Sequence, residues 1–214
     1  MDQMIGLRGR RVQSRERTEA RRRAIMLAAA RVFARKGYDA ATMDDIANQL
    51  GVSKVAIYYH FPSKEALHRE IRVIAISDSI ERLRVIMARG EPPEATLRAV
   101  VRDLVSHAFV DLDKYVALSR MFVRATGQVD KGIFDLQQRC RHMVVNILED
   151  GIREGVFADR DPHIMALTLI RTCYGVVDWY MPDGRLSPEI IVDQVSEQVM
   201  AGVLRCSTGP TTTV

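Results

Sequence analysis

Residues 42–67 read TMDDIANQLGVSKVAIYYHFPSKEAL, and this stretch decides how the first part of the chain folds. Thr42 is a good helix N-cap, and Asp44 and Asp45 follow in the first turn, where carboxylates suit the helix dipole. Gly51 predicts the end of this short helix, because glycine adopts positive φ without steric cost. The apolar positions between them recur at helical spacing: Met43, Ile46, Ala47 and Leu50.

A second short helix follows directly. Ser53 predicts its N-cap, and Phe61 predicts its end near His60, because a residue before proline is disfavoured in the helical region. Ser63 predicts the cap of a further helix.

A supporting helix precedes this pair, from Glu19 to Lys36, and Gly37 closes it. Its apolar face is formed by Ile25, Ala29, Val32 and Phe33. Two short helices behind a supporting helix predict a helix-turn-helix, which is an element that binds DNA.

The second short helix has four consecutive rings, Tyr58 to Phe61, which cannot all face one core. We expect Val52 and Ile57 to point inward and Tyr58 and Phe61 to be mainly packing residues. The remaining polar tips and small apolar groups suit phosphates and base edges. The candidate DNA-binding residues are Thr42, Ser53, Lys54, Val55, Ala56, Tyr59, His60 and Lys64.

The stretch from Arg22 to Leu67 resembles the DNA-binding signature of the tetracycline-repressor (TetR) family of bacterial regulators. The resemblance rests on ARVFARKGY at residues 30–38, on Gly51-Val52-Ser53, and on the run from Ile57 to Leu67. Family members often carry small or hydroxylated residues where this chain has Val55 and Ala56. Apolar side chains there favour thymine methyl groups, so the operator sequence cannot be borrowed from a relative.

Charge is unevenly distributed along the chain. Residues 1–64 contain 13 Lys and Arg against 6 Asp and Glu, whereas residues 65–214 contain 18 against 21. Residues 1–17 are expected to form a flexible basic arm ahead of a helix-turn-helix domain at 18–64. Such an arm either enters an adjacent minor groove or adds only nonspecific attraction.

Beyond this domain the chain is expected to form an all-α bundle over residues 65–206, followed by a disordered tail at 207–214. The predicted helices are 64–89, 94–109, 114–127, 132–155, 161–181 and 187–204. The family resemblance implies that this domain binds a small molecule and forms a homodimer.

Broad apolar faces on the last two helices suit a four-helix interface with a partner's copies, and burial within one chain is the alternative. The residues concerned are Ala166, Leu169, Ile170, Cys173, Tyr174, Val177, Ile190, Ile191, Val195, Val199 and Val203.

A ligand site is expected in the same domain. VVDWYMPDGRLSPEIIVDQV at residues 176–195 resembles the C-terminal part of regulators of fatty-acid and steroid breakdown, which implies an acyl-coenzyme A (acyl-CoA) effector. Arginines in apolar helices, Arg139, Arg141 and Arg171 among them, would meet its phosphates. The candidate ligand residues are Phe109, Arg120, Met121, Phe122, Arg124, Phe134, Met143, Tyr174 and Trp179.

Other functions are less well supported. The five histidines and three scattered cysteines show no metal spacing or disulfide framework, and no nucleophile motif or glycine-rich phosphate loop is present. We expect a cytoplasmic regulator without cofactor, membrane segment or enzymatic activity. Two rivals remain open: a DNA-binding dimer without ligand response, and an efflux-type drug sensor using Asp103, Asp111, Asp135 or Asp178.

Overall fold

The computed structural model describes residues 2–110, 130–181 and 184–205. Within these ranges the regular secondary structure is α-helical, apart from an isolated bridge between Phe157 and Leu204, which confirms the all-α fold class. The expected helix 114–127 and the tail 207–214 lie outside the described residues. The helices are α1 (Asp2–Lys36), α2 (Met43–Leu50), α3 (Lys54–His60), α4 (Lys64–Met87), α5 (Pro93–Val110), α7 (Lys131–Arg153), α8 (Pro162–Trp179) and α9 (Pro188–Val203).

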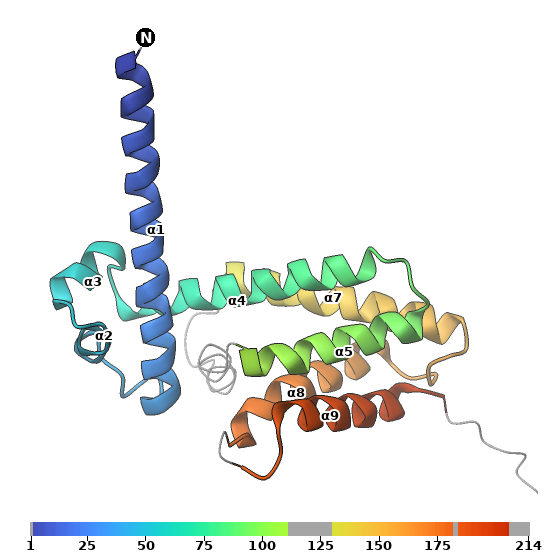
Figure 1. Ribbon diagram of the computed structural model, residues 1–214. Coiled ribbons are helices and arrows are strands. Elements are labelled where there is room, and N and C mark those ends of the chain that lie inside the picture. The colour runs from blue at the N-terminus through green and yellow to red at the C-terminus, as the bar shows by residue number, and fades with distance from the viewer. Residues whose placement is uncertain (1, 111–129, 182–183, 206–214) are drawn as a thin grey trace, which may run out of the picture.

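The helices enclose two separate apolar cores that share α4. Figure 1 shows α1, α2 and α3 gathered at the N-terminal end of α4, with α5, α7, α8 and α9 packed beyond them. Leu67 and Ile71 of α4 are buried in the small core, and Ile80 and Leu83 are buried in the larger one. One continuous helix therefore joins the two halves of the molecule.

α1 begins at Asp2, so the prediction that it starts at Glu19 is wrong. The expected start at Glu19 rested on apolar periodicity, which is missing in the first part of α1. Figure 1 shows this part projecting away from the other helices, where no core requires such a pattern. Residues 2–18 contain five arginines and two glutamines, which are good helix formers, and the segment extends a helix already nucleated further on. The flexibility of residues 1–17 stays a prediction.

Local capping explains the turn between α2 and α3. The Asp45 N–H donates to Thr42 Oγ1 at 3.1 Å, and the Thr42 N–H donates to Asp45 Oδ2 at 3.0 Å, which makes a reciprocal capping box. Gly51 has φ 65° and Ser53 caps α3, as predicted. The bend between the two helices is thus encoded in residues close together in sequence.

The bundle helices also start where the sequence predicts. Asp161 and Ser187 cap α8 and α9, and Pro162 and Pro188 stand in the first turns, where proline costs no hydrogen bond. The other predicted ends differ by one or two residues, as helix ends commonly do.

Gly151 is a position where the backbone packs directly against a ring. A Cβ atom added there would lie 2.1 Å from Cδ2 of Phe157. Phe157 is almost completely buried, so its ring cannot move into solvent. Only glycine allows α7 to approach Phe157 this closely.

We predict that Gly151→Ala lowers the free energy of unfolding by about 1–3 kcal/mol, because the added methyl group overpacks the core. Urea denaturation followed by circular dichroism measures this change. Combining it with Phe157→Leu should destabilise less than the sum of the single variants, since a smaller side chain leaves room. A Gly151→Ala protein as stable as the wild type would contradict the prediction, because alanine is otherwise preferred in helices.

Candidate nucleic-acid interface

α3 has one buried face and one exposed face. Ile57 and Phe61 are 0% and 1% exposed, whereas Val55 and Tyr59 are 77% and 84% exposed. Burial of the first pair fixes the orientation of the helix, and the second pair is left as a protruding surface. The candidate residues Val55 and Tyr59 therefore lie on one side of α3, facing away from the core.

Tyr58 differs from its expected role. Its side chain is 43% exposed, so it is not mainly a packing residue. The reason is geometric: it follows the fully buried Ile57 by about 100° around the helix, and Phe61 already fills the core position one turn later. Tyr58 thus widens the exposed aromatic edge of α3. His60 is half-buried, with its ring edge-on to that of Tyr59 at 5.1 Å.

The candidate residues at the start of α3 have local partners. Lys54 Nζ donates to Asp44 Oδ2 of α2 at 2.6 Å, and this contact raises the pKa of Lys54. Both side chains are about half exposed, so the pair is weak and can be exchanged for another anion. Ser53 Oγ accepts from the N–H of Ala56, which is half-buried, at 3.3 Å.

Thr42 acts primarily as a cap. Its hydroxyl donates to Asp45 Oδ2 at 2.9 Å while accepting the Asp45 N–H. Hydrogen bonds from Lys36 and from Thr42 lower the pKa of Asp45 to about 2.

Lys64 has partners within its own chain. Its Nζ donates to the carbonyl oxygens of Tyr38 and Ala41, both at 2.9 Å, and lies 4.4 Å from the Tyr38 ring centroid. A third carbonyl, that of Asp39, lies at 3.4 Å. An ammonium group has three N–H donors, so a phosphate contact would require Lys64 to exchange one of these partners, and its contact with DNA stays a prediction. In this structure Lys64 fastens the turn between α1 and α2 to the start of α4.

Arg22 was not among the residues predicted from the sequence, and it links α1 to α3 and α4. Its Nη1 donates to the carbonyl oxygen of His60 at 2.7 Å, and its Nη2 bonds to the Glu70 carboxylate. The guanidinium also stacks over the Phe61 ring at 4.4 Å. These partners are far away in sequence, and only the position of Arg22 at the start of the family signature could have indicated a role.

An aromatic cluster completes the junction of α4 with the small core. His68 lies 4.3 Å from the Tyr38 ring and 5.8 Å from the Phe33 ring, measured between centroids. Burial, helped by the charge of Arg72, lowers the pKa of His68 to about 4. Burial and the Glu65 carboxylate raise the pKa of Tyr38 to about 12.

The candidate ligand residues within the described part of the chain lie in different surroundings. Phe109 of α5 stacks edge-on against Tyr180 at 4.8 Å, and Tyr174 packs half-buried on the larger core. Phe134 and Trp179 are 46% and 54% exposed, and their role in ligand binding stays a prediction. Four further candidates lie outside the described residues: Arg120, Met121, Phe122 and Arg124.

Met143 lies elsewhere, on an open groove between α4 and α7. Arg84, Arg139 and His142 also line it, which gives its rim basic character. In the interior of the bundle, the Nε atom of Arg141 and the Nε2 atom of Gln137 are buried without a hydrogen-bond partner. Unsatisfied buried donors are uncommon in folded proteins and suit an acceptor group of a ligand.

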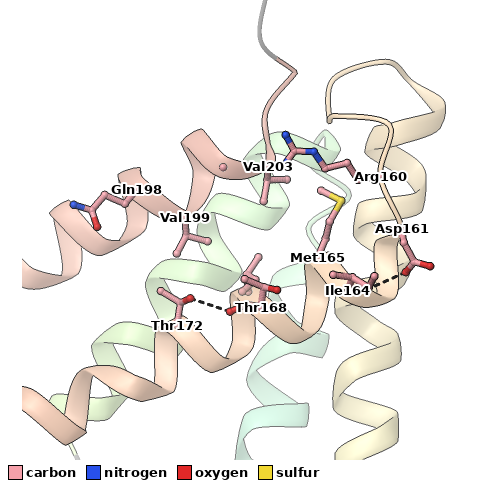
Figure 2. Close-up of a pocket in the computed structure, with 11 residues that line it drawn as sticks. Arg160, Asp161, Ile164, Met165, Thr168, Thr172, Gln198, Val199 and Val203 are labelled. Carbon is pink, nitrogen blue, oxygen red and sulfur yellow. Dashed lines mark hydrogen bonds between the residues drawn. The ribbon is translucent and has the colours of Figure 1, made fainter.

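A second open groove, with an apolar surface, lies between α8 and α9. Figure 2 shows Ile164, Thr168 and Thr172 of α8 beside Gln198 and Val199 of α9, in a groove of about 460 Å³. Ile164 is 65% exposed, and Leu167 on the same helix is 45% exposed.

The interface residues predicted from sequence fall into two groups. Val199 lines this groove, and Ile190 is 44% exposed. Leu169 and Val203 also line the groove but are buried, as are four further residues of the predicted set: Ala166, Cys173, Val177 and Ile191. α8 and α9 use one side of each helix for their own core, because α5 packs against both.

Two family models match the chain. Residues 25–71 match the family model for bacterial regulatory proteins of the tetR family, and residues 90–203 match the tetracyclin repressor-like C-terminal domain. The chain belongs to the TetR family. The expected resemblance is confirmed, and it extends beyond the signature to the C-terminal bundle.

Several TetR-family relatives resemble this chain over most of its length. The HTH-type transcriptional repressor KstR2 of Rhodococcus jostii is 30% identical over 194 residues, covering 86% of this chain and 89% of its own. The ketosteroid transcriptional regulator KstR2 of Mycobacterium tuberculosis superposes with a TM-score of 0.78 at 27% identity, covering 86% of this chain and 95% of its own. AibR in complex with isovaleryl coenzyme A and operator DNA shares the fold, with a TM-score of 0.73 at 24% identity over 83% of this chain and 97% of its own.

Two kinds of feature are absent from the described residues. None of their helices is both long and apolar enough to span a bilayer. No group of three or more His, Cys, Asp or Glu side chains in that part of the chain could hold a metal ion.

We predict that acid weakens the junction through His68. Because its pKa is about 4 when folded and 6.5 when unfolded, the folded state resists protonation, and stability is lost as the pH falls from 6.5 through 4. The loss from this residue should be roughly 2–3 kcal/mol, discounted because the ring is only partly buried. Urea titrations at pH 7 and pH 4 of the wild type and of His68→Phe measure it. An equal loss of stability in both proteins would show that His68 is not responsible.

Proposed function

We propose that this chain represses transcription as a homodimer that binds a palindromic operator through α3 and is released by a small hydrophobic effector. The observation that carries the proposal is the protruding face of α3, where Val55 and Tyr59 are more than three-quarters exposed on a helix anchored by Ile57 and Phe61. Exposed apolar and aromatic groups on a rigid, short helix are costly in water and suit the major groove.

The residues on this face would have different roles. Val55 and Ala56 offer methyl groups to thymine, whereas Ser53, Tyr59 and His60 offer polar tips to phosphates. Lys54 is already bonded to Asp44, so it would have to exchange a carboxylate for a base or phosphate. Thr42 would contribute mainly by capping α2, which positions the turn.

Dimerisation is proposed through the groove between α8 and α9. Its exposed apolar residues on two adjacent, roughly aligned helices suit a four-helix contact with the same surface of a second copy. A two-fold axis at this position would present two copies of α3 to two half-sites, about 34–36 Å apart along the DNA.

For the effector, we propose an acyl-CoA thioester. The KstR2 relatives act in ketosteroid regulation by name, and AibR shows that this fold accommodates an acyl-CoA together with operator DNA. The buried Nε of Arg141 supplies an unsatisfied donor for a polar part of such a ligand. A sensor of cationic drugs would need an unpaired buried carboxylate. Of the four candidates, Asp103 is paired with Arg82 at 3.0 Å, Asp135 and Asp178 are exposed, and Asp111 lies outside the described residues.

We predict that Val55→Ser changes which base is preferred at one position of each half-site, by about 1–3 kcal/mol, because a methyl contact is replaced by a hydroxyl. Tyr59→Phe should instead weaken all sites alike, because phosphate contacts carry no sequence information. Selection from a random duplex pool by each variant, followed by sequencing, measures both effects. An unchanged preference for Val55→Ser would show that α3 does not read bases at this position.

The release mechanism has its own prediction. If an effector weakens operator binding by a factor of about 150, which corresponds to about 3 kcal/mol, the operator must weaken effector binding by the same factor. Calorimetric titration of isovaleryl-CoA and longer acyl-CoA thioesters, with and without the selected operator, measures this coupling. Equal affinity in both titrations would rule out ligand-driven release by acyl-CoA, and failure to form a dimer in ultracentrifugation would rule out palindromic binding.

A further inference from the structure

We propose that Arg22 is a positioning residue that ties the C-terminal end of the recognition helix α3 to α4, so that α3 follows any movement of α4. The inference deepens the proposed function, on which its regulatory meaning rests. It is drawn from one side chain of α1 that contacts α3, α4 and the residue between them.

The first contact closes the end of α3. A helix leaves its last carbonyl groups without partners inside the helix, and α3 ends at His60, whose carbonyl accepts from Arg22 Nη1 at 2.7 Å. The next residue, Phe61, is buried directly beneath the guanidinium at 4.4 Å. Arg22 thus holds the terminal carbonyl and covers the ring that anchors the same end of the helix.

The second contact reaches α4. Arg22 Nη2 bonds to Glu70, which lies between the buried α4 residues Leu67 and Ile71 in sequence. The two side chains are only 25% and 34% exposed, so solvent screens their attraction less than at an open surface. Glu70 fixes the plane of the guanidinium, and the guanidinium fixes His60.

The chemistry requires arginine. Its planar guanidinium carries five donors in a rigid fork, so one group can bond a carbonyl on one side and a carboxylate on the other. A lysine would keep the charge but present a single nitrogen, which cannot keep both contacts in the same geometry.

The opposite end of α3 is attached differently. There, Lys54 pairs with Asp44 of α2, and both side chains are about half exposed. Ser53 accepts a hydrogen bond from within its own helix. The Arg22 contact is therefore the more buried of the two polar attachments described here. Lys64 meanwhile fastens the turn before α2 to the start of α4. The first turns of α4 are thus linked to the turn before α2 through Lys64 and to the end of α3 through Glu70 and Arg22.

The experiment compares Arg22→Lys and Glu70→Gln with two matched controls on the same helices, Arg23→Lys and Glu81→Gln. Arg23 is exposed and lies outside both peptides followed below. Glu81 is well exposed, and among the described residues it pairs with Arg84 of its own helix. Hydrogen–deuterium exchange of the full-length, DNA-free protein is followed in peptides covering residues 54–61 and 25–36. Operator binding is measured on a duplex selected in vitro by the wild type.

We expect exchange in 54–61 to be about tenfold faster in Arg22→Lys and in Glu70→Gln, with 25–36 unchanged, because one charge-assisted hydrogen bond is lost. The double variant should be no faster than Arg22→Lys alone, since both changes break the same link. Operator affinity should fall by a similar factor, and the control variants should behave as the wild type.

Two results would overturn the proposal. One is unchanged exchange of 54–61 in both variants. The other is acceleration spread equally over 25–36 in the milder Glu70→Gln variant, which would make the pair a general stabiliser. Failure of the wild type to select any sequence would count against the proposed repressor function instead, while the exchange comparison still decides the role of Arg22.

Discussion

A helix of seven residues is not stable in water on its own, and α3 depends on the burial of Ile57 and Phe61 against the small core. This burial sets the direction in which Val55 and Tyr59 protrude. Polar contacts then hold each end of α3: Lys54 bonds to Asp44 at the first residue, and Arg22 bonds to the last carbonyl, that of His60. The exposed surface that we propose to face DNA is thus positioned by the core behind it, so substitutions in the core should also alter operator binding.

α4 extends this constraint to the rest of the molecule. It has 24 residues, which span about 36 Å, and it contributes buried residues to both cores. Because α4 is continuous, a shift of its C-terminal half in the larger core would also displace its first turns, which carry Glu70 and Lys64. The groove on α8 and α9 lies on a different part of the bundle, so a dimer formed there would leave α4 free to act as the moving element.

Much of this architecture is encoded locally. The caps at Thr42 and Ser53, the positive φ of Gly51, and the prolines that open α8 and α9 each involve residues a few positions apart. Short-range rules of this kind can be applied to a sequence without knowing the fold. Helical spacing of apolar residues likewise predicted the order of the described helices, and within them it failed at the start of α1, where no core imposes a pattern.

The sequence by itself therefore determined the described helices apart from the start of α1, the turn of the helix-turn-helix, the burial of Ile57 and Phe61, and the family. Only the tertiary structure decided what Lys64 and Arg22 do, that Phe134 and Trp179 are exposed, and which apolar residues of α8 and α9 face outward. Lys64 meets carbonyl groups more than twenty positions away, and Arg22 meets His60 and Glu70 across three elements. A charged side chain has the same pattern in sequence whether it contacts solvent, DNA or a distant carbonyl, because its partner is chosen by how the helices pack.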